Sequence, residues 1–377
     1  MDFTFTEEQQ AVVEAAKAVF ADVAPDGVPS PALTPGCVAE DFDRALWPKL
    51  AAADLLGLLI GPEHGGVDLD PIALCLVLRE SAKVLARVPL LEHSAATATV
   101  RAHGAAELRQ RILPRAAHGE LVLTVAANGR TGHDPAELAV TAHRDGGTWT
   151  LDGLQTGVPW AHNADLVLVP AHIPDGHTVV ALVPRDTAGL TIGEQFSTSG
   201  ERLGELRLED IRLGPDDVIE AEGAWDRLRD LLTTGTCALA LGLGEGVLGM
   251  TSDYTSKREQ FGHPVATFQA VAVQTADRYI DLRAMEVTLW QAAWRISTGA
   301  DSALPTAGDV AVAKIWASDG VRRVVQTAQH LHGGFGADTD YPLHRYHAWA
   351  KQLELSLGPA AAHEEALGDL LAAHALS

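Results

Sequence analysis

Apolar residues in the first third of the chain recur every three to four positions, which is the spacing of amphipathic helices. One such run follows residues 6–9, Thr-Glu-Glu-Gln, an order that is typical of a capped helix start. Similar runs cover 41–56 and 107–117, and another begins at Pro71, a residue suited to the first turn of a helix. The spacing therefore predicts that residues 1–119 are helical.

The pattern changes near residue 120, where short runs of apolar and β-branched residues replace the helical spacing. Glycine and aspartate turns separate these runs, which cover 121–125, 138–142, 148–151, 166–169, 179–183 and 206–211. Short strands joined by such turns are typical of antiparallel barrels and sandwiches. We therefore predict a middle β domain over residues 120–222.

Helical spacing returns at residue 224. Long helices are predicted over 225–257, 268–297, 307–330 and 348–373. Their short connections favour an up-and-down four-helix bundle. The predicted fold class is α+β, with an N-terminal helical domain (1–119), an antiparallel β-barrel domain (120–222) and a C-terminal four-helix bundle (223–377).

The charge of the chain narrows the range of its partners. Its 377 residues include 28 Lys and Arg against 50 Asp and Glu, a formal net charge of −22. So acidic a protein is not expected to bind nucleic acid or an anionic membrane, although a few arginines can still hold a phosphate. Because the sequence shows neither a signal-peptide core nor an apolar run long enough to span a membrane, we expect a soluble, cytoplasmic protein.

The cysteines point to no further chemistry. Cys37, Cys75 and Cys237 are scattered along the chain and form no CxxC pair. We interpret them as ordinary thiols of a reducing cytosol, and we expect neither a disulfide nor a metal site.

Several short motifs follow one another in the C-terminal third. Residues 256–262 read Ser-Lys-Arg-Glu-Gln-Phe-Gly, Phe268–Gln269 come next, and 330–336 read His-Leu-His-Gly-Gly-Phe-Gly. Tyr341–Pro342 and Ala350–Lys351 then follow. With these motifs, and with its order of helices, β domain and bundle, the chain resembles the acyl-CoA dehydrogenase flavoproteins, whose R-x-x-F-G and Q-x-x-G-G-x-G turns occur in the same succession.

The resemblance implies that FAD lies across a subunit interface, where this chain contacts the pyrophosphate of a flavin held mainly by its neighbour. The residues assigned to FAD in this way are Arg258, Phe261, Gln269, His330, Gly333 and Gly334. A guanidinium pairs well with phosphate oxygens, and glycines let backbone N–H groups approach them closely. His330 stands where the family usually has Gln, and either can donate a hydrogen bond. The alternative for Arg258 is a helix-end cation that complements the helix dipole.

The catalytic base of the family is missing from both positions where its members place it. Those enzymes remove an α-proton with a glutamate while a hydride leaves the β-carbon for the flavin. The glutamate of most members falls at Leu357, six residues after Lys351, and that of a second branch at Leu232, 26 residues before Arg258. Neither leucine can accept a proton. Three other carboxylates are expected to be solvated or ion-paired rather than displaced bases: Glu354, Asp230 and Glu245.

The half of the flavin site that a subunit keeps for itself also departs from the family. The loop that resembles T-E-P-x-x-G-S-D reads Ala-Asn-Gly-Arg-Thr-Gly-His-Asp at 127–134. Gly-Val-Pro-Trp at 157–160 replaces the W-I-T-N segment that packs on the flavin ring. Trp160 is more typical of a β-domain core than of a flavin contact. We therefore predict that the half donated to a neighbour is retained and that the other half is lost.

This asymmetry resembles the paired acyl-CoA dehydrogenases of actinobacterial type, which are α2β2 heterotetramers with the base on one kind of subunit. The resemblance implies a base-lacking subunit with shared FAD, a homologous catalytic partner and an acyl-CoA substrate with a bulky acyl group, such as a steroid side chain. It also implies an electron-transfer flavoprotein as acceptor. Two alternatives stay open: a self-sufficient homo-oligomeric flavoenzyme with a relocated base or different chemistry, and a non-enzymatic structural relative.

Overall fold

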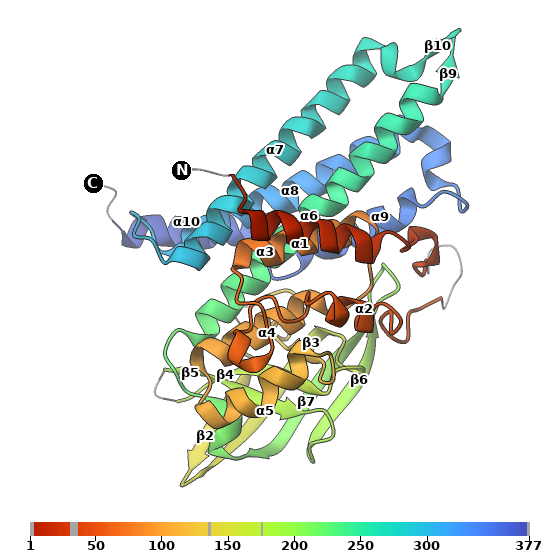
Figure 1. The fold of residues 1–377 in the computed structure, drawn as a ribbon. Helices are drawn as coiled ribbons and strands as arrows, with labels where there is room; N and C mark the ends of the chain where they lie inside the picture. The colour runs from red at the N-terminus through yellow and green to blue at the C-terminus, as the bar shows by residue number, and fades with distance from the viewer. Residues whose placement is uncertain (1–3, 31–36, 135–136, 175, 375–377) are drawn as a thin grey trace. The chain divides into compact units, whose positions relative to one another are not determined.

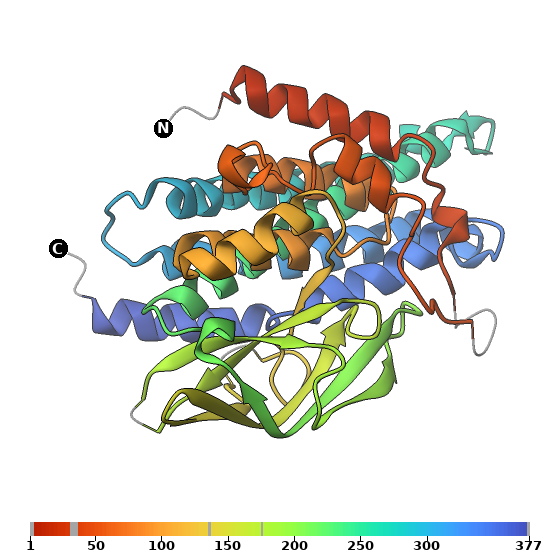
Figure 2. The same ribbon diagram turned by 60° about the horizontal axis from the view of Figure 1, so that its bottom comes forward.

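Helices, a central sheet and further helices follow one another along the chain (Figures 1 and 2), which confirms the predicted α+β fold. The computed structural model describes residues 4–30, 37–134, 137–174 and 176–374. Two compact units are interleaved in the sequence, one made of 1–37, 75–86 and 234–377 and the other of 38–74 and 87–233. The predicted domain boundaries after residues 119 and 222 stay a prediction.

The helices before the sheet are α1 (Glu7–Phe20), η1 (Pro25–Gly27), α2 (Trp47–Ala52), η2 (Pro62–His64), α3 (Pro71–Lys83), α4 (Leu90–His103) and α5 (Ala106–Ala117). Helix α1 begins with the predicted cap. The Thr6 hydroxyl accepts from the Gln9 backbone N–H at 3.2 Å, and the Gln9 side chain accepts from the Thr6 backbone N–H at 3.0 Å. The two bonds satisfy backbone donors that a helix start leaves free.

The run 41–56 contains a shorter helix than its spacing predicts, because α2 begins only at Trp47. Upstream, the Asp43 carboxylate accepts the backbone N–H groups of Ala45 and Leu46, each at 3.0 Å. Such local bonds favour a turn over a helix. Pro48 has no N–H to donate, so it fits only the first turn of α2.

The sheet consists of β1 (Leu123–Val125), β2 (Val140–Asp145), β3 (Thr148–Pro159), β4 (Leu166–His172), β5 (Thr178–Pro184), β6 (Leu190–Phe196), β7 (Arg202–Leu213) and β8 (Val218–Ile219). Its order is β6-β7-β3-β2-β4-β5-β8, and β1 pairs with β4. Most neighbours are antiparallel, whereas β4 runs parallel to β1 and β2. The buried side of the sheet is formed by apolar residues such as Trp149, Val169 and Leu206.

Strand β6 was not predicted from the sequence. It lies at one edge of the sheet, and none of its side chains is fully buried. An edge strand of this kind has no continuous apolar face, so its residues give a weak strand signal.

The C-terminal helices are α6 (Ala224–Lys257), α7 (Gln269–Thr298), α8 (Thr306–His332), η5 (Gly333–Ala337), α9 (Leu343–Leu355) and α10 (Ala360–Ala373). The helix predicted over 348–373 is thus two helices. Leu357 and Gly358, with φ of 57° and 96°, form the turn between them. Pro359 is the residue immediately before α10. A proline is tolerated there because a helix start needs no intrahelical hydrogen bond from its N–H.

Helix α6 packs closely on α3 and α7 because it has glycines at the contacts. A Cβ at Gly242 would lie 2.0 Å from the Arg79 carbonyl oxygen, and one at Gly244 would lie 2.7 Å from Leu282. Arg79 then pairs with two carboxylates, Glu245 of α6 and Glu286 of α7. By length and composition α6 could cross a membrane, but 78% of its apolar window is buried within the described structure, as in a core helix.

Candidate functional site

Arg258 directly follows the last residue of α6 and is exposed. Its backbone N–H donates to the Tyr254 carbonyl at 2.9 Å, and its carbonyl accepts from the Val265 N–H at 2.8 Å, so the main chain is fixed. Its guanidinium has no ion pair or hydrogen bond with any residue that the structure describes. An unpaired arginine is notable in a chain of net charge −22, where a carboxylate partner is easily found.

A two-residue hairpin follows Arg258 and is formed by β9 (Glu259–Gln260) and β10 (His263–Pro264). The turn residues, Phe261 and Gly262, have φ of 54° and 79°, the conformation of a type I′ turn. Phenylalanine adopts a positive φ rarely. Phe261 is 91% exposed, and its ring meets that of Phe268 edge-on, at 6.4 Å between ring centres. The hairpin therefore presents a large apolar side chain to the outside of this chain.

The remaining residues assigned to FAD by resemblance are also on the surface. Gln269 is the first residue of α7, and His330 lies in the last turn of α8; both are exposed. Gly333 has φ 60° and ψ −138°, which an L-residue adopts only with strain. A Cβ at Gly333 or Gly334 would meet no atom within 4 Å. The outer face of this turn is open, and a ligand can approach its backbone closely.

A cluster of four rings lies beside the glycine turn and was missed by the sequence reasoning. Tyr254 of α6 stacks on His332 and Phe335, with ring centres 4.4 and 5.2 Å apart. Tyr341 contacts the same two rings at 5.2 and 4.6 Å. Because Tyr254 is one helical turn before Arg258, the cluster connects the arginine to the glycine turn. The sequence does contain a signal for this cluster, because Tyr254 and Arg258 are four residues apart and therefore lie on the same face of a helix.

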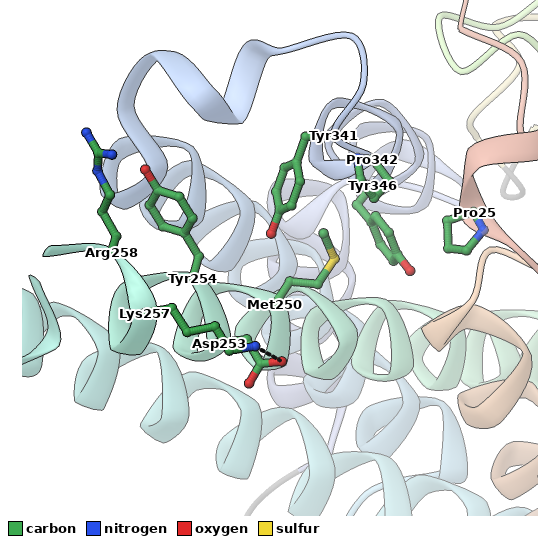
Figure 3. Close-up of a pocket in the computed structure, with 9 residues that line it drawn as sticks. All are labelled: Pro25, Met250, Asp253, Tyr254, Lys257, Arg258, Tyr341, Pro342 and Tyr346. Atoms are coloured by element: carbon green, nitrogen blue, oxygen red, sulfur yellow. Dashed lines mark ion pairs between the residues drawn. The ribbon is translucent and has the colours of Figure 1, made fainter. Parts of the chain in front are cut away.

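A groove of about 670 Å³ opens next to this cluster (Figure 3). Its lining combines aromatic and apolar side chains with charged ones near the end of α6: Pro25, Met250, Asp253, Tyr254, Lys257, Arg258, Tyr341, Pro342 and Tyr346. Lys257 and Asp253 form a long ion pair of 3.9 Å, while Arg258 extends beyond Tyr254. The cations therefore remain available at one end of the groove.

Both positions assigned to the base are apolar and buried. Leu357 and Leu232 are 6% and 3% exposed. Leu357 has φ 57°, so the turn keeps a conformation that strains a leucine. Its carbonyl oxygen is 2.8 Å from Nε2 of His363, which ties the turn to α10.

Two of the other three carboxylates are ion-paired, as expected. Glu354 contacts Lys351 at 2.5 Å and Arg322 at 3.8 Å, and Glu245 contacts Arg79. Asp230 differs, because its carboxylate has no hydrogen bond or ion pair among the described residues. Burial raises the pKa of Asp230 to about 6, against the opposing effect of Arg229. Of these three carboxylates, Asp230 therefore most resembles a general base by environment.

The two segments that differ from the family's flavin-ring motifs, 127–134 and 157–160, contact each other. The Asn128 side chain donates to the Gly157 carbonyl at 2.9 Å, and the Thr156 hydroxyl donates to the Arg130 carbonyl at 2.8 Å. A Cβ at Gly157 would lie 3.1 Å from the Gly132 carbonyl oxygen. These backbones therefore pack directly on each other, and the Gly157 backbone N–H donates to the Gln195 side chain at 2.8 Å.

Trp160 is held within the same unit. Its indole N–H donates to Glu92 at 3.2 Å, and its ring meets the edge of Phe42 at 6.2 Å. Burial raises the pKa of Glu92 to about 7, so this carboxyl is largely protonated at mildly acidic pH. The indole N–H is thus bonded within this unit, but Trp160 is half-buried and does not belong to the buried core that the sequence predicted for it.

Sequence comparisons match both ends of the chain to known domains. Residues 6–120 match the acyl-CoA dehydrogenase N-terminal domain, and residues 233–371 match the acyl-CoA dehydrogenase C-terminal domain. The chain is 36% identical over 342 residues to the acyl-CoA dehydrogenase FadE27 of Mycobacterium tuberculosis, with 88% of this chain and 89% of that protein covered. The chain belongs to the acyl-CoA dehydrogenase family.

Two solved acyl-CoA dehydrogenase structures are especially similar. The ChsE4–ChsE5 complex from Mycobacterium tuberculosis matches with a TM-score of 0.89 and 34% identity, covering 99% of both chains. The Tcur3481–Tcur3483 steroid ACAD matches with a TM-score of 0.88 and 38% identity, covering 97% of this chain and 98% of that chain. Members of the acyl-CoA dehydrogenase family bind FAD, as in a glutaryl-CoA dehydrogenase from Mycobacterium smegmatis in complex with FADH2.

Proposed function

We propose that this acyl-CoA dehydrogenase is the base-lacking subunit of a heteromeric, FAD-dependent enzyme that desaturates acyl-CoA thioesters. One observation carries the proposal. The residues assigned to the outer half of an FAD site are exposed, and Arg258 has no ion pair among the described residues, whereas both base positions hold buried leucines. A chain of this kind can support a neighbour's flavin without performing the proton transfer itself.

The outer residues fit the phosphates of FAD. Arg258 offers a free guanidinium, and the open glycine turn offers backbone that no side chain shields. Phe261 and Gln269 flank the arginine at the hairpin and at the start of α7, and His330 precedes the turn. Bound FAD would supply the hydride acceptor of the desaturation. The role of this chain is to hold the dinucleotide and to exclude water from it.

The ring half of the site fits FAD poorly in this chain. The segments 127–134 and 157–160 bond to each other, and Trp160 is engaged by Glu92. A flavin ring placed there would have to break these bonds. We therefore place the flavin ring and the catalytic glutamate on a homologous partner, in an α2β2 assembly in which FAD is shared at the interface.

An exposed apolar stripe supports an assembly of this kind. Along α7, Val273, Ile280 and Val287 recur every seven residues and are 52%, 62% and 52% exposed. Phe261, at 91% exposure, lies at the hairpin before α7. Such a stripe is rarely left in water by a soluble protein. The ChsE4–ChsE5 and Tcur3481–Tcur3483 structures are complexes of unlike chains, which favours a homologous subunit as its occupant.

The similar structures also favour a substrate class. Because the Tcur3481–Tcur3483 protein is a steroid ACAD, we propose a bulky acyl-CoA, such as a steroid side-chain thioester, as the substrate of the complex. We further propose that the complex works in the cytoplasm and passes electrons to an electron-transfer flavoprotein. The self-sufficient enzyme remains the second candidate, and the environment of Asp230 is the observation that favours it.

Substitution of Arg258 tests the outer FAD contact. Arg258→Ala in the complex is expected to weaken FAD binding by roughly ten- to a hundredfold, the value of a charge-assisted contact of about 1.5–3 kcal/mol. Flavin retained after gel filtration and its absorbance measure this. The matched control is Arg115→Ala, which removes another exposed arginine that makes no ion pair among the described residues. Equal flavin content in Arg258→Ala and wild type would show that Arg258 is a helix-end cation.

A further inference from the structure

The glycine turn is flanked by two members of the ring cluster, His332 on one side and Phe335 on the other. Both rings stack on Tyr254, and both also contact Tyr341. On its outer face the turn has no such support, since a Cβ at Gly333 or Gly334 would meet nothing within 4 Å. The position of the turn therefore depends on the rings behind it. Two successive glycines have the largest backbone freedom to lose, so this support matters for a backbone that must bind a ligand.

A chain of two hydrogen bonds fixes the ring of His332. Its Nδ1 is 2.8 Å from the Ala328 carbonyl oxygen, which can only accept, so Nδ1 carries the proton. Its Nε2 is 3.1 Å from the Tyr341 hydroxyl and must then accept from it. His332 is 3% exposed, and burial lowers its pKa, which keeps the ring neutral. Burial also raises the pKa of Tyr341, with smaller contributions from Asp253 and Tyr254, so its hydroxyl keeps the donated proton.

We infer that Tyr341 and His332 are positioning residues: they hold Gly333 and Gly334 in the shape that receives the phosphates of FAD, without touching the ligand themselves. The inference rests on the proposed function. It deepens that function by giving Tyr341 and His332, which are not among the residues assigned to FAD, a role in FAD binding. A turn already held in its bound shape loses less entropy on binding, so the pair increases affinity through preorganisation.

The same geometry gives the pair a pH dependence. When His332 becomes protonated, Nε2 turns into a donor and can no longer accept from Tyr341. One partner must then rotate, which disturbs the ring beside Gly333. Among the described residues, the nearby groups that titrate or carry charge are Asp253, Tyr254 and Lys257 of α6, Arg258 directly after it, His330 of α8, and His344 of α9, whose Nδ1 is 2.9 Å from the Tyr341 carbonyl oxygen. Because the pKa of His332 is lowered, the weakening of FAD binding is expected below the range in which an ordinary histidine titrates.

Removal of a single hydroxyl tests the positioning role. In the flavin-carrying assembly of this chain, Tyr341→Phe keeps the ring and removes the donor to His332. We expect the FAD dissociation constant to rise about three- to thirtyfold, the effect of leaving one buried acceptor unpaired. The matched control is Tyr346→Phe. Tyr346 lines the same groove, but its hydroxyl donates to the Lys83 carbonyl at 2.6 Å, away from the glycine turn. Tyr346→Phe should leave FAD affinity within about twofold.

A second variant separates positioning from general stability. Gln in place of His332 can still accept from Tyr341 but does not titrate. His332→Gln should therefore bind FAD nearly as well as wild type at about pH 8, and should lose the weakening seen in wild type toward about pH 5. The same acid weakening in His332→Gln and wild type, or equal losses of FAD in Tyr341→Phe and Tyr346→Phe, would overturn the inference.

Arg258→Ala in the same assembly distinguishes this inference from the function on which it rests. If Arg258→Ala releases FAD and Tyr341→Phe does not, the positioning role alone is wrong. If Arg258→Ala retains FAD, the outer contact itself is wrong, and the positioning role falls with it.

Discussion

At the scale of single residues, the contacts of Trp160 show how its indole is held. Trp160 has φ 58°, its indole N–H donates to Glu92, and its ring contacts Phe42. Glu92 lies in α4 among buried neighbours, where its charged form is poorly solvated. Burial therefore raises the pKa of Glu92 and favours its protonated form in the fold, against the opposing effect of the hydrogen bond from Trp160.

Glu92→Gln is expected to stabilise the protein at neutral and alkaline pH. The carboxyl keeps its proton in the fold up to about pH 7, whereas in the unfolded chain it ionises above about 4.5. Raising the pH between these values therefore favours unfolding. Gln can still accept from Trp160 but carries no charge, so the variant should gain about 1–2 kcal/mol at about pH 8 and nothing at about pH 4. Urea unfolding at both pH values measures the difference.

The same substitution at the exposed Glu120 serves as control and should leave the pH dependence of stability as it is in wild type. A Glu92→Gln variant that is equally stable relative to wild type at both pH values would mean that Glu92 ionises normally in the fold.

Removal of carboxylates tests whether this chain provides the base. Asp230→Asn and Glu354→Ala are both expected to leave turnover of the complex within about twofold, because no proton passes through either group, whereas loss of a true general base costs roughly 10²–10⁴-fold. The equivalent change of the partner's glutamate should abolish turnover. A large loss in Asp230→Asn with FAD still bound would make Asp230 a relocated base and this chain an enzyme in its own right.

At the scale of secondary structure elements, a buried lysine connects α8 to the end of α9. Lys314 is fully buried and donates to the Ser318 hydroxyl at 2.7 Å and to the Leu353 and Glu354 carbonyls at 3.1 Å each. Those carbonyls belong to the last turn of α9, where no later N–H is available. Burial lowers the pKa of Lys314 to about 8. The lysine thus fixes the helix end that leads into the turn at Leu357.

Lys314→Met is expected to lower the free energy of unfolding by about 1–3 kcal/mol, because it keeps the side-chain length but removes the ammonium that donates to the Leu353 carbonyl. The Glu354 carbonyl still accepts from the Ser318 hydroxyl at 3.1 Å. A lower urea midpoint at unchanged slope would show this. Lys351→Met is the matched control: its ammonium is largely exposed and pairs with Glu354, so it should change stability by less than about 1 kcal/mol. Equal effects of the two substitutions would contradict the capping role.

At the scale of the whole molecule, the exposed apolar residues of α7 and of the hairpin indicate that this surface binds a partner protein. The unit that carries them also carries Arg258 and the glycine turn. A partner that covers the stripe would therefore bind the same unit to which we assign the outer FAD contacts. Assembly and flavin retention are expected to depend on each other for this reason.

The flavin content of purified protein tests the assembly. The chain alone should bind little FAD, and the complex should bind about one FAD per pair of unlike chains, as shared interface sites require. Flavin absorbance together with the mass of the assembly in solution gives this ratio. A homo-oligomer of this chain with one tightly bound FAD per subunit would instead support the self-sufficient enzyme.

Much of the fold could be predicted from local patterns. The capped start of α1, the hairpin after Lys257 and the glycine turn depend on neighbouring residues, so short motifs indicate them. Strand β6 and the division of 348–373 into α9 and α10 were not predicted. The first depends on pairing with β7, and the second on a positive φ at Leu357 that leucine does not favour by itself.

The sequence by itself determined the family, the α+β fold and the apolar identity of Leu357 and Leu232, because motifs and residue identities are local properties. Only the tertiary structure decided which polar groups have partners. Glu245 forms an ion pair with Arg79, and Glu354 forms one with Lys351, whereas the guanidinium of Arg258 has no ion pair among the described residues. Folding also brings Tyr254, His332 and Tyr341 together behind the glycine turn. The physical reason is that burial, ring stacking and charge pairing depend on residues far apart in sequence, which periodicity cannot register.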